Sequence, residues 1–260
     1  MKAFLVEKYK KKGVLKLAEV PVPKTQDNDV LIEVHAAAVN QLDSKIRDGE
    51  FKLLLPYRTP FILGHDVAGV VKSVGAKVTR FKVGDEVYSR PRDHRQGTFA
   101  EFIAVHEDDV AIKPKNLSMN ESASIPLVGL TAWQALIELA QVKPGQKVFI
   151  QAGSGGVGTF AIQLAKHLGA FVATTTSAEN VELVKSLGAD VVVDYQKQDF
   201  EKVLSGYDFV LNSQDGATLE RSLCVLKRGG YLMKLKKKGA RLVVFGILKF
   251  LPTRAKLGFI

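Results

Sequence analysis

The sequence predicts an α/β protein in which a β-rich part is followed by a parallel sheet with alternating helices. Over residues 1–120, short apolar runs follow one another at close intervals with turn signals between them, which is typical of a barrel-like domain. From Lys147 onward, strand-like and helix-like segments alternate, and this order favours a parallel sheet. A glycine-rich turn joins the first strand of that sheet to a helix.

The elements of the β-rich part are predicted first. Its strand candidates are residues 4–7, 30–37, 67–74, 87–88, 99–105 and 110–112. Residues 119–139 then read as helices that lead into the second part. We therefore expect one domain over residues 1–120, a second over 121–232, and a basic and apolar C-terminal segment over 233–260 that includes a candidate late strand at 242–248.

The glycine turn predicts a site for a dinucleotide. Residues 148–150 read as a buried strand and 159–168 as a helix, with Gly153, Gly155 and Gly158 between them in G-x-G-x-x-G spacing. The first glycine permits a tight turn, the second lets the backbone approach a pyrophosphate, and the third lets helix and strand pack closely. The helix N-terminus adds free N–H groups and a positive dipole end. The predicted binding residues of this turn are Gly153, Ser154, Gly155, Gly156, Val157 and Gly158.

The next strand, residues 171–176, indicates which dinucleotide is bound. Sites that prefer NAD place an acid at the end of this strand to hold the ribose 2′-hydroxyl. Here the sequence is Thr-Thr-Thr-Ser-Ala over residues 174–178, with no acid before Glu179. Hydroxyl groups can donate to a 2′-phosphate that a carboxylate would repel, so we predict NADPH. Thr176 and Ser177 also suit the cap of the helix that follows, and both roles are compatible. The predicted 2′-phosphate ligands are Thr176, Ser177, Asn180 and Tyr195.

Composition and charge restrict the class of protein. Of the 260 residues, 46% are hydrophobic and 25% charged, which is an ordinary globular composition. The single cysteine, Cys224, excludes an intrachain disulfide and is expected in the core, and a reducing, cytoplasmic location fits it. The net charge of +10 arises in residues 227–260, which carry no acid. Binding of nucleic acid or membrane by this basic tail is not favoured, but the charge leaves it open.

Five segments in the same order resemble the medium-chain dehydrogenase/reductase superfamily, in its zinc-independent quinone and enone oxidoreductase (zeta-crystallin-like) branch. The resemblance implies a GroES-like catalytic domain followed by a Rossmann NADP-binding domain, an active site in the cleft between them, and a homodimer. The segments are residues 64–75 (GHDVAGVVKSVG), 81–87 (FKVGDEV), 97–102 (GTFAEF), 129–133 (GLTAW) and 152–158 (AGSGGVG).

The pattern of zinc ligands in this family is incomplete here. Zinc-dependent relatives use an early cysteine, a histidine in Gly-His-Glu, and a later cysteine or acid. This sequence has Asn40 at the early position and His65 in Gly-His-Asp, with no cysteine before Cys224. One histidine with an adjacent acid does not make a tetrahedral site. The sequence therefore predicts no catalytic zinc, and His65 is expected to be an oriented polar group or a packing residue.

The resemblance implies four candidate catalytic residues in the first part. In the family, an Asn-x-x-Asp motif at the position of Asn40 and Asp43 faces the cleft. Asn40 is then placed to bind a substrate carbonyl or the cofactor, with Asp43 and Lys45 as a polar pair beside it. Tyr57 is the candidate proton donor, with His94 and solvent as the alternatives.

Three further cofactor contacts follow from the resemblance. Thr131 matches a position near the nicotinamide, and Asn212 and Ser213, after the strand at 209–211, match contacts to the nicotinamide ribose. Asn and Asp also favour turns and helix caps, so a purely structural role stays open for these side chains.

The expected function is hydride transfer from NADPH to quinones or α,β-unsaturated carbonyls. In the family, the chain returns from the Rossmann core to the catalytic domain, and this sequence has no such segment. A shortened product, which we favour, a partner that completes the cleft, and a naturally short variant are the three explanations. The alternative function is a catalytically impaired protein that binds NADPH or a partner.

Overall fold

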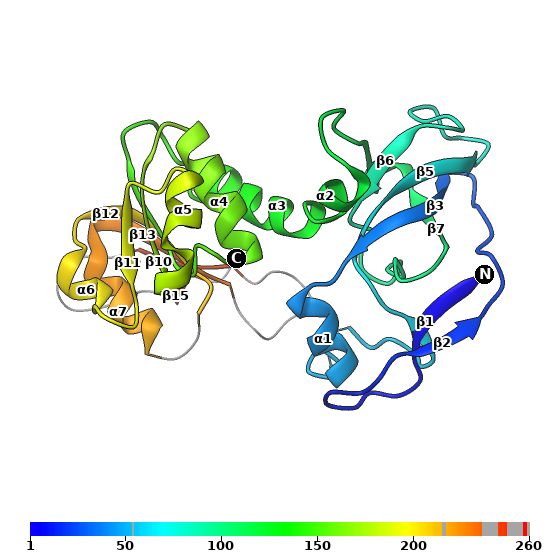
Figure 1. The fold of residues 1–260 in the computed structure, drawn as a ribbon, viewed down its shortest axis with the longest axis horizontal. Coiled ribbons are helices and arrows are strands. Elements are labelled where there is room, and N and C mark those ends of the chain that lie inside the picture. Colours follow the sequence, from blue (N-terminus) through cyan, green and yellow to red (C-terminus); the bar gives the residue numbers. More distant parts are fainter. Residues whose placement is uncertain (54, 215–216, 236–243, 249–256, 259–260) are drawn as a thin grey trace. The chain divides into compact units, whose positions relative to one another are not determined.

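The computed structural model describes residues 1–53, 55–214, 217–235, 244–248 and 257–258. The chain divides into two compact units, Met1–Leu127 and Val128–Ile260 (Figure 1). The first is built from antiparallel strands and the second from a mainly parallel sheet with helices, so the predicted fold class is confirmed. Among the described residues, no helix is long and apolar enough to span a membrane.

The first unit contains a five-stranded antiparallel sheet in the order β7-β3-β5-β6-β8. Its core is apolar, and Val30, Ile32 and Val67 are fully buried in it. Short apolar runs of this kind are the pattern from which the strands were predicted. The strands are β3 (Asp29–Ala38), β5 (Asp66–Val74), β6 (Glu86–Ser89), β7 (Phe102–His106) and β8 (Val110–Ile112).

A smaller antiparallel sheet lies in the same unit, in the order β2-β1-β4. The predicted strand at 99–105 begins only at Phe102, because the residues before it bond to β1 instead: the N–H of Phe4 donates to the carbonyl of Phe99 at 2.9 Å. The elements are β1 (Lys2–Val6), β2 (Lys16–Glu19) and β4 (Phe61–Ile62), with the helices α1 (Gln41–Asp48), η1 (Glu107–Asp109) and α2 (Met119–Ala123).

The second unit is built on a seven-stranded sheet in the order β11-β10-β9-β12-β13-β14-β15. The first five strands are parallel, and β14 and β15 are antiparallel. Chain order reverses direction between β9 and β12, and ligands of such sheets bind outside the strand ends at this point. The strands are β9 (Lys147–Ile150), β10 (Phe171–Thr176), β11 (Val191–Asp194), β12 (Tyr207–Asn212), β13 (Leu226–Leu235), β14 (Val244–Leu248) and β15 (Leu257–Gly258).

Helices cover both faces of this sheet, with α4 and α5 on one side and α6 and α7 on the other (Figure 1). Val148 and Ile150 of β9 belong to the core under α4, and Phe149 between them belongs to the core under α6. The strand is therefore buried on both faces, which explains its unbroken apolar sequence. The helices are α3 (Pro126–Trp133), η2 (Gln134–Leu139), α4 (Gly156–His167), η3 (Ala178–Asn180), α5 (Val181–Ser186), α6 (Phe200–Val203) and α7 (Thr218–Val225).

Three details differ from the sequence prediction or lie beyond the described residues. The helix predicted from residue 159 begins at Gly156. Cys224 is exposed rather than in the core, because Ser222 and Val225 form the buried side of α7. Most basic residues of the C-terminal segment, including Lys236, Lys237 and Arg241, lie outside the described residues.

An ion pair holds the segment before β7 to the start of β3. Arg95 donates to both carboxylate oxygens of buried Asp29, at 3.0 and 2.7 Å, and the N–H of Gln26 donates to the same carboxylate at 3.1 Å. Burial alone raises the pKa of Asp29, but the hydrogen bonds from Arg95 and Gln26 outweigh it and lower the pKa below its usual value. The ionised carboxylate therefore stabilises the unit above the pKa of an unfolded aspartate, about 4.

We predict that Asp29→Asn lowers the free energy of unfolding by about 3 kcal/mol at neutral pH, because it leaves the Arg95 guanidinium without its partner. Since a lowered pKa stabilises only while the group is ionised, the loss should shrink as pH falls below about 4. Urea unfolding at pH 7 and pH 3.5 measures both, with exposed Asp27→Asn as the matched control. An equal loss at the two pH values would contradict this account.

Candidate functional site

The glycine turn lies between the end of β9 and the start of α4. It is held against the end of β10, because the N–H of Gly153 donates to the carbonyl of Thr175 at 2.9 Å and the N–H of Ala152 to its hydroxyl at 3.1 Å. Gly155 is the N-cap residue of α4. The first-turn N–H groups of a helix have no acceptor within the helix, so they are available to an anion at this position.

Two glycines of the turn are required by packing and one is not. A Cβ on Gly153 would overlap the hydroxyl of Thr174, and a Cβ on Gly158 would overlap the carbonyl oxygen of Ala152. On Gly155, the nearest atom would be the carbonyl oxygen of Ala152 at 3.3 Å, and this residue is exposed. The absence of a side chain at Gly155 therefore leaves the backbone accessible from solvent, as the motif requires for a pyrophosphate.

The predicted 2′-phosphate residues lie together at the end of β10. The Thr176 hydroxyl donates to the hydroxyl of Ser154 at 2.9 Å, which links this strand end to the glycine turn. The amide of Asn180 donates to the hydroxyl of Ser177 at 3.1 Å. The N–H of Tyr195 donates to the carbonyl of Thr176 at 3.2 Å, and the residue is 59% exposed. Hydroxyl and amide groups thus form one polar surface beside the turn.

A carboxylate lies at the edge of this surface. The Ser177 hydroxyl donates to Glu179 at 3.2 Å, and Glu179 is exposed. A carboxylate repels a phosphate and accepts a hydrogen bond from a ribose hydroxyl. The position of Glu179 therefore disfavours binding of the 2′-phosphate of NADPH. Because Glu179 is exposed, its side chain can also point into solvent.

Buried amides occur where β9 and β12 end, on either side of the reversal point of the sheet. Asn212 is fully buried; its oxygen accepts from the N–H of Gln214 at 2.7 Å, and its nitrogen has no partner among the described residues. The Ser213 hydroxyl donates to the carbonyl of Gln151 at 3.3 Å. The Gln151 side chain donates to Ser222 at 2.6 Å. Sequence reasoning missed Gln151, although a polar residue directly after a buried strand signals this strand end.

Thr131, the residue predicted to lie near the nicotinamide, belongs to α3 and is 5% exposed. A hydroxyl buried to this degree is as a rule already hydrogen-bonded within the protein. The burial of Thr131 therefore does not test its contact with the cofactor, which remains a prediction.

In the first unit, Asn40 and Asp43 come together at the start of α1. Asn40 is the N-cap residue, and its N–H donates to one oxygen of Asp43 at 2.7 Å. The other oxygen of Asp43 lies 2.6 Å from Nδ1 of His65, and both side chains are buried. Asp43 is therefore paired with His65, whereas the expected polar pair of Asp43 with Lys45, which lies further along α1, stays a prediction.

Asp66, the first residue of β5, completes this cluster. The amide nitrogen of Asn40 donates to one oxygen of Asp66 at 2.9 Å, and the N–H of Leu127 donates to the other at 2.9 Å. Burial raises the pKa of Asp66 to about 7, and the neighbouring Asp43 adds to the effect. Sequence reasoning missed Asp66, although an acid inside an apolar run signals a buried group that needs partners.

Tyr57 is buried between α1 and β4, with its ring 5.4 Å from that of His94. Its hydroxyl has no hydrogen-bond partner among the described residues. Burial, together with the nearby Asp93, raises the pKa of Tyr57 to about 12. The phenol therefore stays protonated at neutral pH and is a weak proton donor.

The described residues bring no three His, Cys, Asp or Glu side chains together in a group that would hold a metal ion. His65 faces Asp43 through Nδ1. In metal sites, such a carboxylate usually orients a histidine whose other nitrogen binds the metal, together with further ligands. Asn40, where zinc-dependent relatives have a cysteine, instead bonds to Asp66.

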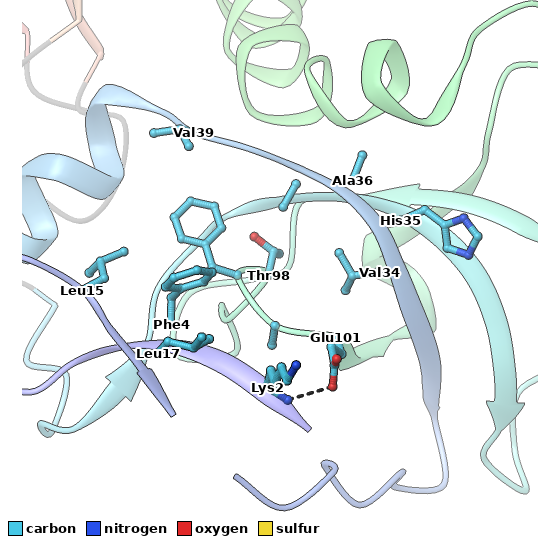
Figure 2. Close-up of a pocket in the computed structure, with 13 residues that line it drawn as sticks. Lys2, Phe4, Leu15, Leu17, Val34, His35, Ala36, Val39, Thr98 and Glu101 are labelled. Carbon is cyan, nitrogen blue, oxygen red and sulfur yellow. Dashed lines mark hydrogen bonds between the residues drawn. The ribbon is translucent and has the colours of Figure 1, made fainter. Parts of the chain in front are cut away.

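An apolar pocket of about 600 Å³ lies elsewhere in the first unit, beside β1 and β3 (Figure 2). Phe4, Leu17, Val34 and Val39 contribute apolar walls, and Glu101, which accepts from the N–H of Lys2 at 2.8 Å, lies at its polar side. Its described lining includes none of the residues predicted from sequence, so it is separate from the Asn40 cluster.

Comparisons with known proteins agree with both units. Residues 26–115 match the family model of the alcohol dehydrogenase GroES-like domain, and residues 156–254 match the model named zinc-binding dehydrogenase. The 2-methylene-furan-3-one reductase of Solanum lycopersicum is 42% identical, and the chloroplastic NADPH-dependent alkenal/one oxidoreductase of Arabidopsis thaliana is 39% identical. Each alignment covers 90% of this chain and 62% of the relative, so the chain spans less than two thirds of their length.

A solved structure extends the match to three dimensions. The quinone oxidoreductase of Coxiella burnetii is 36% identical with a TM-score of 0.85, and the match covers 91% of this chain and 76% of that one. The motifs, the two units and these similarities agree. The chain belongs to the medium-chain dehydrogenase/reductase superfamily, in its quinone oxidoreductase branch.

Proposed function

We propose that this protein is an NADPH-dependent oxidoreductase that transfers hydride to quinones or α,β-unsaturated carbonyl compounds without a catalytic zinc. The observation that carries the proposal is the glycine turn before α4, with hydroxyl and amide groups instead of an acid at the end of β10. The names of the two curated relatives support this class of acceptor. A homodimer and a cytoplasmic location remain predictions from the sequence.

The residues of the second unit fit the parts of the cofactor in order. The turn at 153–155 and the N-terminus of α4 would hold the pyrophosphate, since Gly155 leaves room and the helix presents free N–H groups. Ser177, Asn180 and Tyr195 would hold the 2′-phosphate. The buried amide nitrogen of Asn212 would donate to the nicotinamide riboside, with Thr131 and Ser213 near it. When bound, the nicotinamide supplies the hydride.

In the first unit, Asn40 is the residue that would bind the substrate oxygen. Hydride addition to a conjugated carbonyl places negative charge on that oxygen, and a fixed N–H donor stabilises the charge. Asp43 acts on Asn40 by accepting its backbone N–H. Because the pKa of Tyr57 is about 12, we propose that solvent, rather than Tyr57, provides the proton. The role of Lys45 stays a prediction.

Turnover tests the proposed function directly. We expect the purified chain to oxidise NADPH in the presence of 1,4-benzoquinone, 9,10-phenanthrenequinone or short enones, because the glycine turn and Asn40 supply the contacts that the proposal assigns to cofactor and substrate. Absorbance at the nicotinamide band measures the rate, and binding of NADPH is followed in parallel. Binding without turnover of any acceptor would support the alternative, a non-catalytic NADPH-binding protein.

The cofactor site predicts the effect of a methyl group at residue 155. Gly155→Ala should raise the Kd for NADPH at least about tenfold, since the added methyl stands where the pyrophosphate approaches the backbone. The thermal midpoint should change only slightly, because a Cβ at this position lies 3.3 Å from the carbonyl oxygen of Ala152, a tight contact but not an overlap. Gln163→Ala, exposed on the same helix, is the control. Unchanged affinity in Gly155→Ala would place the cofactor elsewhere.

The choice of cofactor depends on charge at the end of β10. Ser177→Asp should weaken NADPH binding by about tenfold or more and leave NADH binding nearly unchanged, since only the 2′-phosphate is repelled. Glu179→Gln should do the opposite and tighten NADPH. Fluorescence titration with both cofactors measures the effects. Equal losses for NADPH and NADH in Ser177→Asp would show that this surface does not face the 2′ position.

A further inference from the structure

Asn40 donates hydrogen bonds to two buried carboxylates. Its backbone N–H donates to Asp43 at 2.7 Å and its side-chain nitrogen to Asp66 at 2.9 Å. Asp43 and Asp66 are both almost fully buried, whereas Asn40 is partly exposed. The residue thus combines a fixed interior side with a side that a ligand can reach.

The chemistry of Asp66 determines how the carboxamide of Asn40 is turned. An ionised carboxylate only accepts hydrogen bonds, so the amide group must face it with its nitrogen and not with its oxygen. The second oxygen of Asp66 accepts from the N–H of Leu127, so each oxygen of the carboxylate has one donor. An amide nitrogen carries two N–H donors, and one of them is left for a ligand.

We propose that Asp66 is a positioning residue, whose buried carboxylate turns the amide of Asn40 so that its remaining N–H is presented to the carbonyl oxygen of the quinone or enone. This inference rests on the proposed function. It assigns to Asp66 a part in the reaction without contact with the substrate. Its role differs from that of Asp43, which binds the backbone of Asn40 and the ring of His65.

The surroundings of Asp66 make the arrangement sensitive to pH. Asp43 on α1 raises the pKa of Asp66, whereas Arg90, after β6, lowers it. The other nearby elements contribute groups that already have partners or carry no charge. His65 is paired with Asp43, and Glu121 of α2 accepts from Ser118. The residue of β3 opposite Asp66 is the uncharged Ala38. With burial as the main cause, the pKa is about 7.

A proton on Asp66 turns one of its oxygens into a hydroxyl that donates and is a weaker acceptor, which weakens the hydrogen bond from Leu127 or from Asn40. The amide of Asn40 then loses its fixed orientation. We therefore expect kcat/KM of the wild-type enzyme to fall as pH falls through about 7, at saturating NADPH. A proton on Asp66 that only changed packing would still lower kcat/KM in Asn40→Ala as pH falls, whereas an effect through the amide of Asn40 would be absent from that variant.

The test compares Asp66→Asn with Asn40→Ala and with the double variant. Each single change should lower kcat/KM for the enone or quinone about tenfold at pH 8, where Asp66 is ionised, and leave the Kd for NADPH unchanged. The double variant should be no slower than Asn40→Ala, because Asp66 acts through Asn40. Asp66→Asn should also lose the decrease below pH 7. Exposed Asp108→Asn is the control, and thermal melts report folding.

The outcomes separate this inference from the proposed function. Suppose that the wild type turns over its acceptor. If Asp66→Asn then retains the wild-type kcat/KM, or if the losses of the two single variants multiply in the double variant, the role of Asp66 alone is overturned. If Asp66→Asn fails to fold, the pH profile of the wild type decides, since a constant kcat/KM between pH 6 and 8.5 contradicts the inference. Absence of turnover by the wild type overturns the proposed function and this inference with it.

Discussion

The close contact between the glycine turn and the end of β10 is the constraint on which the second unit depends. Gly153 and Gly158 bring the turn against Thr174 and Ala152 at distances that no other residue allows. This approach sets the start of α4 beside the hydroxyl groups of Thr176 and Ser154. The proposed anion binding by the helix and the proposed selection at the ribose would therefore both follow from one packing contact.

In the first unit, the main constraint is the burial of ionisable groups. A buried charge costs several kcal/mol unless it is paired and hydrogen-bonded. Asp43 and Asp66 meet that requirement by accepting N–H groups from Asn40, His65 and Leu127. The raised pKa of Asp66 shows that the compensation is incomplete. Incomplete compensation of this kind is common where a protein positions groups for chemistry.

The sequence predicted the fold where local pattern decides it. The strand predicted over residues 171–176 is confirmed as β10, because a strand buried on both faces has an unbroken run of β-forming residues. The start of α4 was placed too late, since glycines were interpreted as turn residues although they belong to the first helical turn. The exposure of Cys224 also depends on which side of α7 meets the sheet.

The candidate site was less predictable because it depends on contacts between distant segments. Asn40 lies 26 positions from Asp66, and nothing in the local pattern pairs them. His65, which lies 22 positions from Asp43, could likewise not be paired with it from the local pattern. By contrast, the hydroxyl groups after β10 follow the glycine turn at a fixed spacing, so they could be proposed from the sequence alone, and their role stays a prediction.

The central claim is that the end of β10 recognises a 2′-phosphate, and fragments of the cofactor test it most directly. Calorimetric titration with 2′,5′-ADP and with 5′-ADP isolates this contact from turnover and from the first unit. The account predicts that 2′,5′-ADP binds at least about tenfold tighter, with an advantage that decreases as salt is added. Equal affinities, or tighter binding of 5′-ADP, would contradict it and assign the site to the ribose hydroxyl and Glu179.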